Sequence, residues 1–202
     1  MNIKKTANLL LNFTIKRLAE IFGIVIFFFG LALLIALITF SPDDPNFIFP
    51  KNTQIKNLLG FQGSFISDLF FQSIGWVSYL VSFTFLITGI NIFISKDFFL
   101  FIENIFFSIL YSLFATLFLS HYYSDIFTLY INGNGGFVGN YLDKTFLKSI
   151  ILINEGVFYY ILILLTLIIF LISINFSIKT FIKFIKKILY FFLKDNNKIY
   201  TN

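Results

Sequence analysis

The chain has 202 residues, of which 58% are hydrophobic and 12% charged, and its mean hydropathy is +0.88. A soluble domain carries roughly a quarter charged residues, so this composition excludes an ordinary soluble domain and predicts an all-α membrane protein. The chain has no cysteine, which excludes disulfides, thiolate metal sites and cysteine nucleophiles.

Four apolar runs are long enough to cross a bilayer, which takes about 20 helical residues. They cover about residues 21–40, 69–94, 98–120 and 153–175. Only Ser95-Lys96-Asp97 separates the second run from the third, so these two are expected to form a tight helical hairpin. The sequence therefore predicts a basic leader at 1–20, a four-transmembrane-helix bundle within 21–176, and a cytoplasmic tail at 177–202.

Lysine and arginine are shared unevenly between the two sides of this predicted bundle. Eleven of them lie in the two termini and the 95–97 turn, and four lie in the segments 41–66 and 121–149. Lys and Arg in short loops tend to remain in the cytoplasm. We therefore expect an N-in, C-in topology with the two longer segments outside, and this topology accounts for the net charge of +5 without a partner.

The tail predicts a basic amphipathic helix. One helical face carries Lys179, Lys183, Lys186 and Lys187, while Phe, Ile and Leu cover most of the remaining surface. Such a helix suits the anionic inner leaflet of the bilayer. A continuation of the fourth span with snorkelling lysines is the alternative. Binding to nucleic acid would use the same lysines, but no aromatic stacking platform lies beside them.

The first outer loop opens with the sequence Pro42-Asp43-Asp44-Pro45. Two prolines around two acids end a helix, and a turn at the membrane interface is one interpretation. A cation site is the other, although two carboxylates supply too few oxygens for calcium. Asp68 follows at the outer mouth of the second span. It is interpreted either as a cap that complements a helix N-terminus or as a functional acid at membrane depth.

Small residues form a stripe along the second span. The stripe consists of Gly75, Ser78, Ser82 and Gly89, whose spacing places them on one helical face. Helices in lipid associate through close packing at such faces. We therefore expect the second span to be central and to pack against the first, where Ala32 and Ala36 have matching spacing. The same stripe also fits a subunit interface.

The second outer loop begins near His121, the only histidine. Asp125 lies one helical turn further on, and a His–Asp pair can act as an acid–base unit. The neighbouring tyrosines instead favour anchoring at the membrane interface. Too few potential ligands surround His121 for zinc. We predict no catalytic residue, metal site or cofactor, and a short amphipathic helix on the outer face near residues 137–148.

Several of these features recur in one order along the chain. In that order the residues are Arg17, Glu20, Pro42, Asp43, Asp44, Pro45, Asn57, Gly60, Gly63, Asp68, Gly75, Gly135, Gly136 and Gly139. Their order and spacing within a four-span protein resemble the N-terminal membrane domain of the FtsK-type bacterial DNA translocases. The resemblance runs from about Arg17 to Ile174, and its most specific part lies between residues 40 and 75.

This resemblance implies an inner-membrane domain that anchors a hexameric cytoplasmic DNA motor at the division septum. It implies a homo-oligomer, divisome proteins as partners, and contact with DNA only through the motor. No glycine in this chain is followed by lysine, so the phosphate-binding G-x-x-x-x-G-K-[ST] loop is not in it.

The chain is therefore expected to be a non-enzymatic piece of a longer translocase, or a membrane domain encoded separately. The alternative is a small transporter or channel subunit, which would need polar residues at mid-span.

Overall fold

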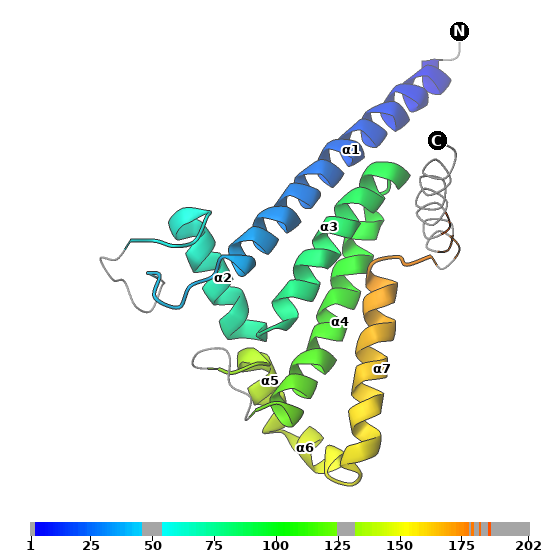
Figure 1. The fold of residues 1–202 in the computed structure, drawn as a ribbon. Coiled ribbons are helices and arrows are strands. Elements are labelled where there is room, and N and C mark those ends of the chain that lie inside the picture. The colour runs from blue at the N-terminus through cyan, green and yellow to red at the C-terminus, as the bar shows by residue number, and fades with distance from the viewer. Residues whose placement is uncertain are drawn as a thin grey trace, which may run out of the picture.

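The computed structural model describes residues 3–45, 54–124 and 132–177, together with Lys179, Ile182 and Lys186. Within these residues every regular element is an α-helix. The helices are α1 (Ile3–Ile38), α2 (Gly60–Ile74), α3 (Val77–Ser95), α4 (Phe99–Tyr122), α5 (Gly136–Asp143), α6 (Phe146–Ile151) and α7 (Glu155–Ser173). The all-α prediction is thus confirmed for this part of the chain (Figure 1).

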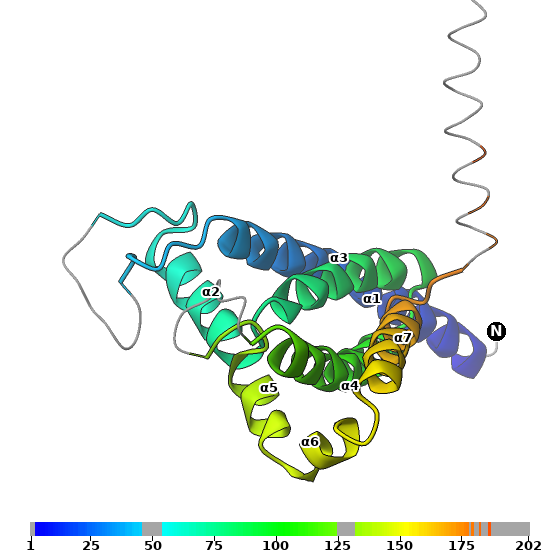
Figure 2. The ribbon, with the colours of Figure 1, turned by 60° about the horizontal axis from the view of Figure 1, so that its bottom comes forward.

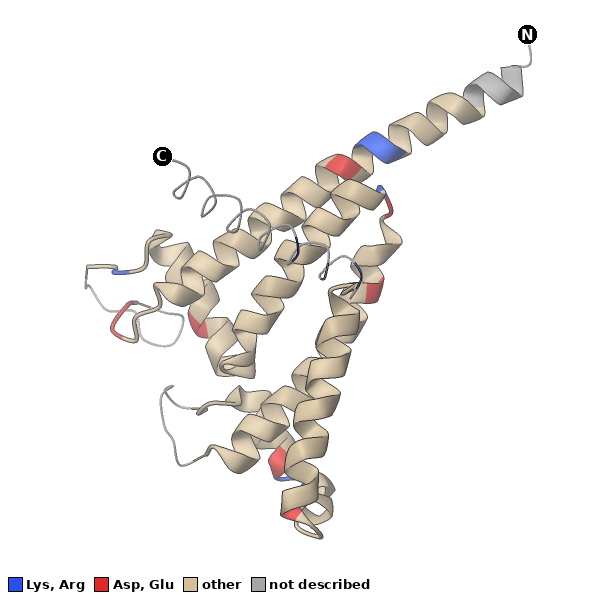
Figure 3. Cartoon of the chain, turned by 45° about the vertical axis from the view of Figure 1, so that its right-hand side comes forward, with Lys and Arg blue, Asp and Glu red and all other residues tan. Residues whose placement is uncertain are grey.

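Four of these helices are long and apolar enough to cross a membrane. Their qualifying segments are Asn8–Ile38, Val77–Ser95, Phe99–Tyr122 and Glu155–Ser173. They match the four predicted spans, so the four-span bundle is confirmed, while its orientation stays a prediction. Figure 3 shows the charged residues of the described helices mainly near the two ends of the bundle, as a protein in lipid requires.

The predicted leader and first span are one continuous helix, because α1 runs for 36 residues without a break at residue 20. At the other end of the chain, only isolated residues are described beyond Ser177. The predicted amphipathic helix, with Lys183 and Lys187, therefore lies outside the described residues, whereas Lys179 and Lys186 are among those described.

The predicted second span is wrong at its start. The apolar run continues through Gly75, but the helix does not: α2 ends at Ile74, and α3 begins at Val77. Gly75 has a φ of +59°, a left-handed conformation that breaks the helix and that glycine adopts at little cost. Gly75 therefore does not share a helical face with Ser78, Ser82 and Gly89, and the chain reverses direction between α2 and α3 (Figure 1).

The contact between α1 and α3 is the most extensive in the bundle. Gly89 of α3 lies against the backbone of Gly23 and Phe27, and a Cβ on Gly23 would come within 2.7 Å of the Gly89 carbonyl oxygen. Gly30 lies as close to the backbone of Leu86. The predicted packing of the second span on the first is confirmed, and its close contacts come from glycines in both helices.

Ala32 and Ala36, whose spacing we expected to serve that contact, line a groove between α1 and α2. Ser78 and Ser82 are fully buried, and each hydroxyl donates to a carbonyl three residues earlier in the chain. The stripe therefore lies inside the bundle. This location places Ser78 and Ser82 within one subunit instead of on an exposed subunit interface.

Polar side chains join α3, α4 and α7 inside the bundle. The Tyr111 hydroxyl lies 2.9 Å from Thr84 Oγ1 and accepts from Ser108. The Asn104 amide donates to Thr88, and its oxygen accepts from Asn175 just past α7. Hydrogen bonds of this kind contribute to helix association in lipid, where the hydrophobic effect between helices is absent.

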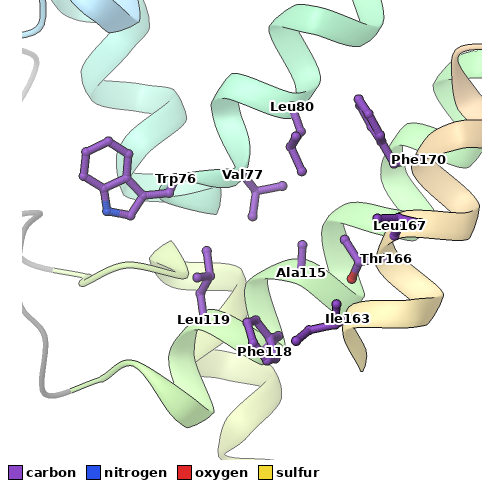
Figure 4. Close-up of a pocket in the computed structure, with 10 residues that line it drawn as sticks. All are labelled: Trp76, Val77, Leu80, Ala115, Phe118, Leu119, Ile163, Thr166, Leu167 and Phe170. Atoms are coloured by element: carbon purple, nitrogen blue, oxygen red, sulfur yellow. The ribbon is translucent and has the colours of Figure 1, made fainter. Parts of the chain in front are cut away.

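Beside this network, α3, α4 and α7 surround an apolar cavity of about 420 Å³. Figure 4 shows its lining, in which the side chains of Val77, Ala115 and Phe170 come from three different helices. The Thr166 hydroxyl is buried there without a hydrogen-bond partner among the described residues. The apolar lining does not suit a polar substrate.

The glycine contact between α1 and α3 leads to a stability prediction. Replacing Gly89 with alanine puts a methyl group into the backbone of Phe27. We expect the free energy of unfolding in mixed micelles to fall by about 1–3 kcal/mol, the usual cost of overpacking. Circular dichroism during titration with a denaturing detergent measures this change.

Gly156→Ala is the matched control. The nearest atom to a Cβ at Gly156 is 3.8 Å away, at ordinary contact distance. This variant should unfold like the wild type. Equal stability of the Gly89 and Gly156 variants would contradict the assigned helix contact.

Candidate interaction surface at the loop end of the bundle

The bundle has a loop end, which carries the first outer loop (41–59), α2, the second outer loop (123–135), α5 and α6 (Figures 1 and 2). Most residues of the predicted family pattern lie there. The following paragraphs describe how these residues hold the two outer loops on the bundle.

Asp44 closes the first outer loop. Its carboxylate is buried, and its two oxygens accept hydrogen bonds from the backbone amides of Lys56 and Asn57, each at 2.8 Å. Charge-assisted hydrogen bonds of this kind are stronger than neutral ones. Asp43 points the other way, where its exposed carboxylate pairs with the Lys56 ammonium at 3.0 Å. The two adjacent acids therefore have different roles.

This geometry favours the turn interpretation over the cation site, because both Asp44 oxygens are occupied by amide donors. Among the described residues, no group of three or more His, Cys, Asp or Glu side chains is arranged to hold a metal. The carbonyl of Pro45 accepts a hydrogen bond from the Ser64 hydroxyl at 3.0 Å. The Pro42–Pro45 segment is thus tied to α2 as well as to its own loop.

Asn57 connects the returning loop to α1 and α2. Its side-chain amide donates to the carbonyl of Ala36 at 2.9 Å, and its side-chain oxygen accepts from the Leu59 amide at 3.1 Å. The side chain is almost fully buried. Asn57 therefore fixes the position at which the chain enters α2.

Gly60 and Gly63 follow, and each position requires glycine for a different physical reason. Gly60 has a φ of +66° with open space around it, so its backbone conformation is the constraint. At Gly63 the constraint is space, because a Cβ there would overlap the side chain of Asn57. The spacing Asn57-x-x-Gly60-x-x-Gly63 thus encodes one local structure.

The break at Gly75 is filled by the second outer loop. The carbonyl of Asn134 accepts from the Trp76 backbone amide at 3.0 Å, and its side-chain oxygen accepts from the Trp76 indole at 3.1 Å. A side chain on Gly75 would overlap the Asn134 carbonyl, and one on Gly136 would meet the backbone of Ile74. The loop and the break are therefore complementary in shape and in hydrogen bonding.

Gly135 and Gly139 bring α5 directly onto α4. A Cβ on either glycine would overlap the Thr116 carbonyl and the Ser120 hydroxyl. The three glycines of the second loop that the family pattern includes therefore mediate contact with α2, with the break at Gly75 and with α4. Sequence reasoning missed Asn134, although its position between Gly133 and Gly135 marked it as a turn residue.

The structure bears on two interpretations of single residues at the loop end. Asp68 does not cap a helix N-terminus, because α2 begins at Gly60 and Asp68 lies buried past its middle. The partner of His121 is Asp143 of α5, with 2.6 Å between Nδ1 and Oδ1, whereas Asp125 is outside the described residues. The pair joins α4 to α5, and Lys148 lies 3.6 Å from the same carboxylate.

The short helix predicted near residues 137–148 is present as two helices, α5 and α6. At the opposite end of the bundle, Glu20 pairs with Arg17 one turn earlier and with Lys96 at 2.8 Å. This ion-pair cluster joins α1 to the turn between α3 and α4. Arg17 and Glu20 therefore act at a different place from the rest of the family pattern.

Comparison with known proteins gives a family for this arrangement. Residues 15–186 match the model of the 4TM region of DNA translocase FtsK/SpoIIIE. The chain is 33% identical over 72 residues to a DNA translocase FtsK of Azospirillum brasilense, covering 35% of this chain and 11% of that protein.

It is also 30% identical over 69 residues to the DNA translocase FtsK of Rickettsia prowazekii (strain Madrid E), covering 34% of this chain and 9% of that protein. The chain thus spans only about a tenth of the length of these relatives. No solved structure matches it.

The loop closure by Asp44 leads to a paired prediction. Asp44→Ala leaves two backbone amides without their acceptor, and we expect a loss of about 1–3 kcal/mol in the free energy of unfolding. Asp43→Ala removes an exposed ion pair with Lys56, and exposed pairs contribute little, so its stability should stay closer to the wild type. Unfolding titrations of both variants in micelles measure the difference, and equal losses would contradict the distinct roles of the two acids.

Proposed function

The chain belongs to the family of the four-transmembrane region of the DNA translocases FtsK and SpoIIIE, and from this premise we propose that it anchors such a translocase at the division septum. The observation that carries the proposal is the family match, which extends over residues 15–186. The chain is a multi-pass domain of the inner membrane. We propose its role in cell division and in chromosome segregation.

The chain itself is a membrane anchor domain. DNA translocation appears in the names of its relatives, and the chain spans only about a tenth of their length. We propose that any motor activity and any contact with DNA reside in a cytoplasmic motor, linked to or associated with this domain. The sequence supports this division, because it has no Gly-Lys pair from which a phosphate-binding loop could be built. The transporter alternative gains no support from the comparisons.

We further propose that the anchor is homo-oligomeric, with six copies by analogy with the family, and that its partners are divisome proteins. The loop end offers an exposed surface at Asp43 and Lys56 on one loop and at Phe137 and Tyr141 on α5. The rigid attachment of both loops supports a role in presenting this surface. The lysines of the tail are proposed to lie on the anionic inner leaflet.

A fluorescent fusion of residues 1–202 tests the septal role. We expect a band at mid-cell in dividing cells of a bacterium that contains the matching translocase. The Lys56→Glu variant reverses one exposed charge without removing the backbone amide that Asp44 binds, so it should weaken the band while membrane levels on an immunoblot stay unchanged. Uniform membrane fluorescence throughout division would contradict the septal role.

Alkaline phosphatase fusions test the topology, because this enzyme is active only outside the cytoplasm. A fusion at Lys198 should be inactive and a fusion at Lys56 active, as the distribution of lysine and arginine predicts. Activity at Lys198 with none at Lys56 would reverse the assignment. A fusion at Lys96 is the control for the cytoplasmic side and should also be inactive.

A further inference from the structure

Helix α2 has the polarity of its faces reversed. Of its polar residues, Ser64, Ser67 and Asp68 are at most 7% exposed, whereas Gln62 in the first turn is exposed beside the groove to α1. On its outer face, Phe61 is 52% exposed and Leu69 is 53% exposed, and Leu58 just before the helix is 75% exposed. A helix that packs on a protein surface in water shows the opposite arrangement, with its apolar stripe inward and its polar face outward. The reversed arrangement is expected when the surrounding solvent is lipid.

The position of α2 along α1 agrees with this. A groove of about 310 Å³ separates the first half of α2 from the second half of α1. Among the residues that line it are Phe29, Ala32 and Ala36 of α1 and Leu59, Gly63 and Ile66 of α2. Phe71, near the other end of α2, instead packs against Leu37 and Phe40. The start of α2 thus lies beside the membrane-crossing part of α1, and its end lies beside the terminus of α1 (Figure 1).

Helix geometry gives the depth of α2 in the membrane. If the hydrocarbon layer ends near Ile38, Ala32 lies about 9 Å inside it, at about 1.5 Å of rise per residue. The first turns of α2 are therefore level with the hydrocarbon of the leaflet at the loop end. With 15 residues, α2 is too short to cross a layer about 30 Å thick.

The hydrogen bonds at the start of α2 also suit lipid. The Leu58 amide donates to Thr39 Oγ1, the Leu59 amide donates to the Asn57 side chain, and the Gly60 amide donates to the Asn57 carbonyl. Amides at the start of a helix usually bind water. In hydrocarbon each backbone amide needs a partner within the protein, and these three have one; Leu58 and Leu59 precede the helix, and Gly60 is its first residue.

We propose that α2 is a lipid-facing half-helix, embedded in the leaflet at the loop end, and that acyl chains cover Phe61 and the residues beside it. The chain then enters the hydrocarbon at Asn57, returns to the interface near Gly75 and crosses the membrane as α3. The lipid-facing surface of α1, where Phe28 is 59% exposed and Phe29 is 45% exposed, continues onto α2 across the groove. This proposal does not depend on the septal role.

This placement explains why polar side chains of α2 face the rest of the protein. Ser64 donates to the Pro45 carbonyl at 3.0 Å, and Ser67 donates to the carbonyl of Gly63 at 2.8 Å. These groups and Asp68 lie between α2 and the rest of the protein, away from lipid. Among the described residues of the first loop, the segment around Asp43 and Lys56 then remains exposed to water.

The absence of native cysteine allows a direct test with single-cysteine variants. Phe61→Cys and Leu69→Cys place probes on the outer face of α2, and Lys56→Cys is the water-exposed control. The proteins are reconstituted in lipid nanodiscs, in which both faces of the bilayer are open to reagents. Two readouts are taken: the rate of reaction with a membrane-impermeant maleimide, and quenching of an attached fluorophore by lipids that carry a nitroxide at defined depths.

We expect the Phe61 probe to react several-fold more slowly than the Lys56 probe and to be quenched best by the deeper nitroxide. The Leu69 probe should be quenched best by the shallower nitroxide, because the end of α2 lies at the interface. Circular dichroism identifies any variant that fails to fold, and Leu58→Cys then replaces it.

Two results would overturn the proposal. If the probes on α2 react as fast as the Lys56 probe and lipid does not quench them, α2 lies in water. If they are protected from the maleimide but not quenched by lipid, a second copy of the chain or another protein covers α2. Chemical crosslinking through the same cysteines would then identify a second copy.

Discussion

The structure depends on one constraint: a backbone polar group inside a membrane must find its partner within the protein. Continuous helix satisfies this constraint along α1, α3, α4 and α7. At two places where a helix stops, an asparagine from elsewhere in the chain supplies a partner. Asn134 does so at the break between α2 and α3, and Asn91 does so where it donates to the carbonyl of Ile174, just past α7. Both asparagines come from elements distant in the sequence, so they also hold the bundle together.

The same constraint explains the chemistry of the loop end. Close approach of two backbones requires glycine, and a turn near the membrane requires an acid or an amide to bind its free amides. Asp44 and Asn57 supply these acceptors, while Gly63 and Gly139 allow the close approach. Residues that resemble a functional motif in the sequence thus have a structural role in this fold, because they bind free amides and allow close backbone contacts. An interaction surface built on them is rigid, which is a useful property in an anchor.

Hydropathy was sufficient to predict the four spans, because a run of about twenty apolar residues is typical of a membrane-spanning helix and rare in a soluble protein. It could not predict the break at Gly75, since the residues on both sides are apolar and the partner of the break is 59 residues further on. Nor could it distinguish Asp43 from Asp44. The two are adjacent residues of one type, and only the returning loop decides which of them is buried.

The placement of α2 bears on how an anchor of this kind meets its partners. A half-helix in lipid hides the outer face of α2 from water, and Asn134 of the second loop fits into the break beside it. Among the described residues, the segment around Asp43 and Lys56 and the exposed face of α5 are then the targets for proteins in the aqueous space. Partners that are themselves membrane helices also have a target on α7, which is the least buried of the four spans. An anchor with this architecture can therefore be recognised both at the loop end and within the bilayer.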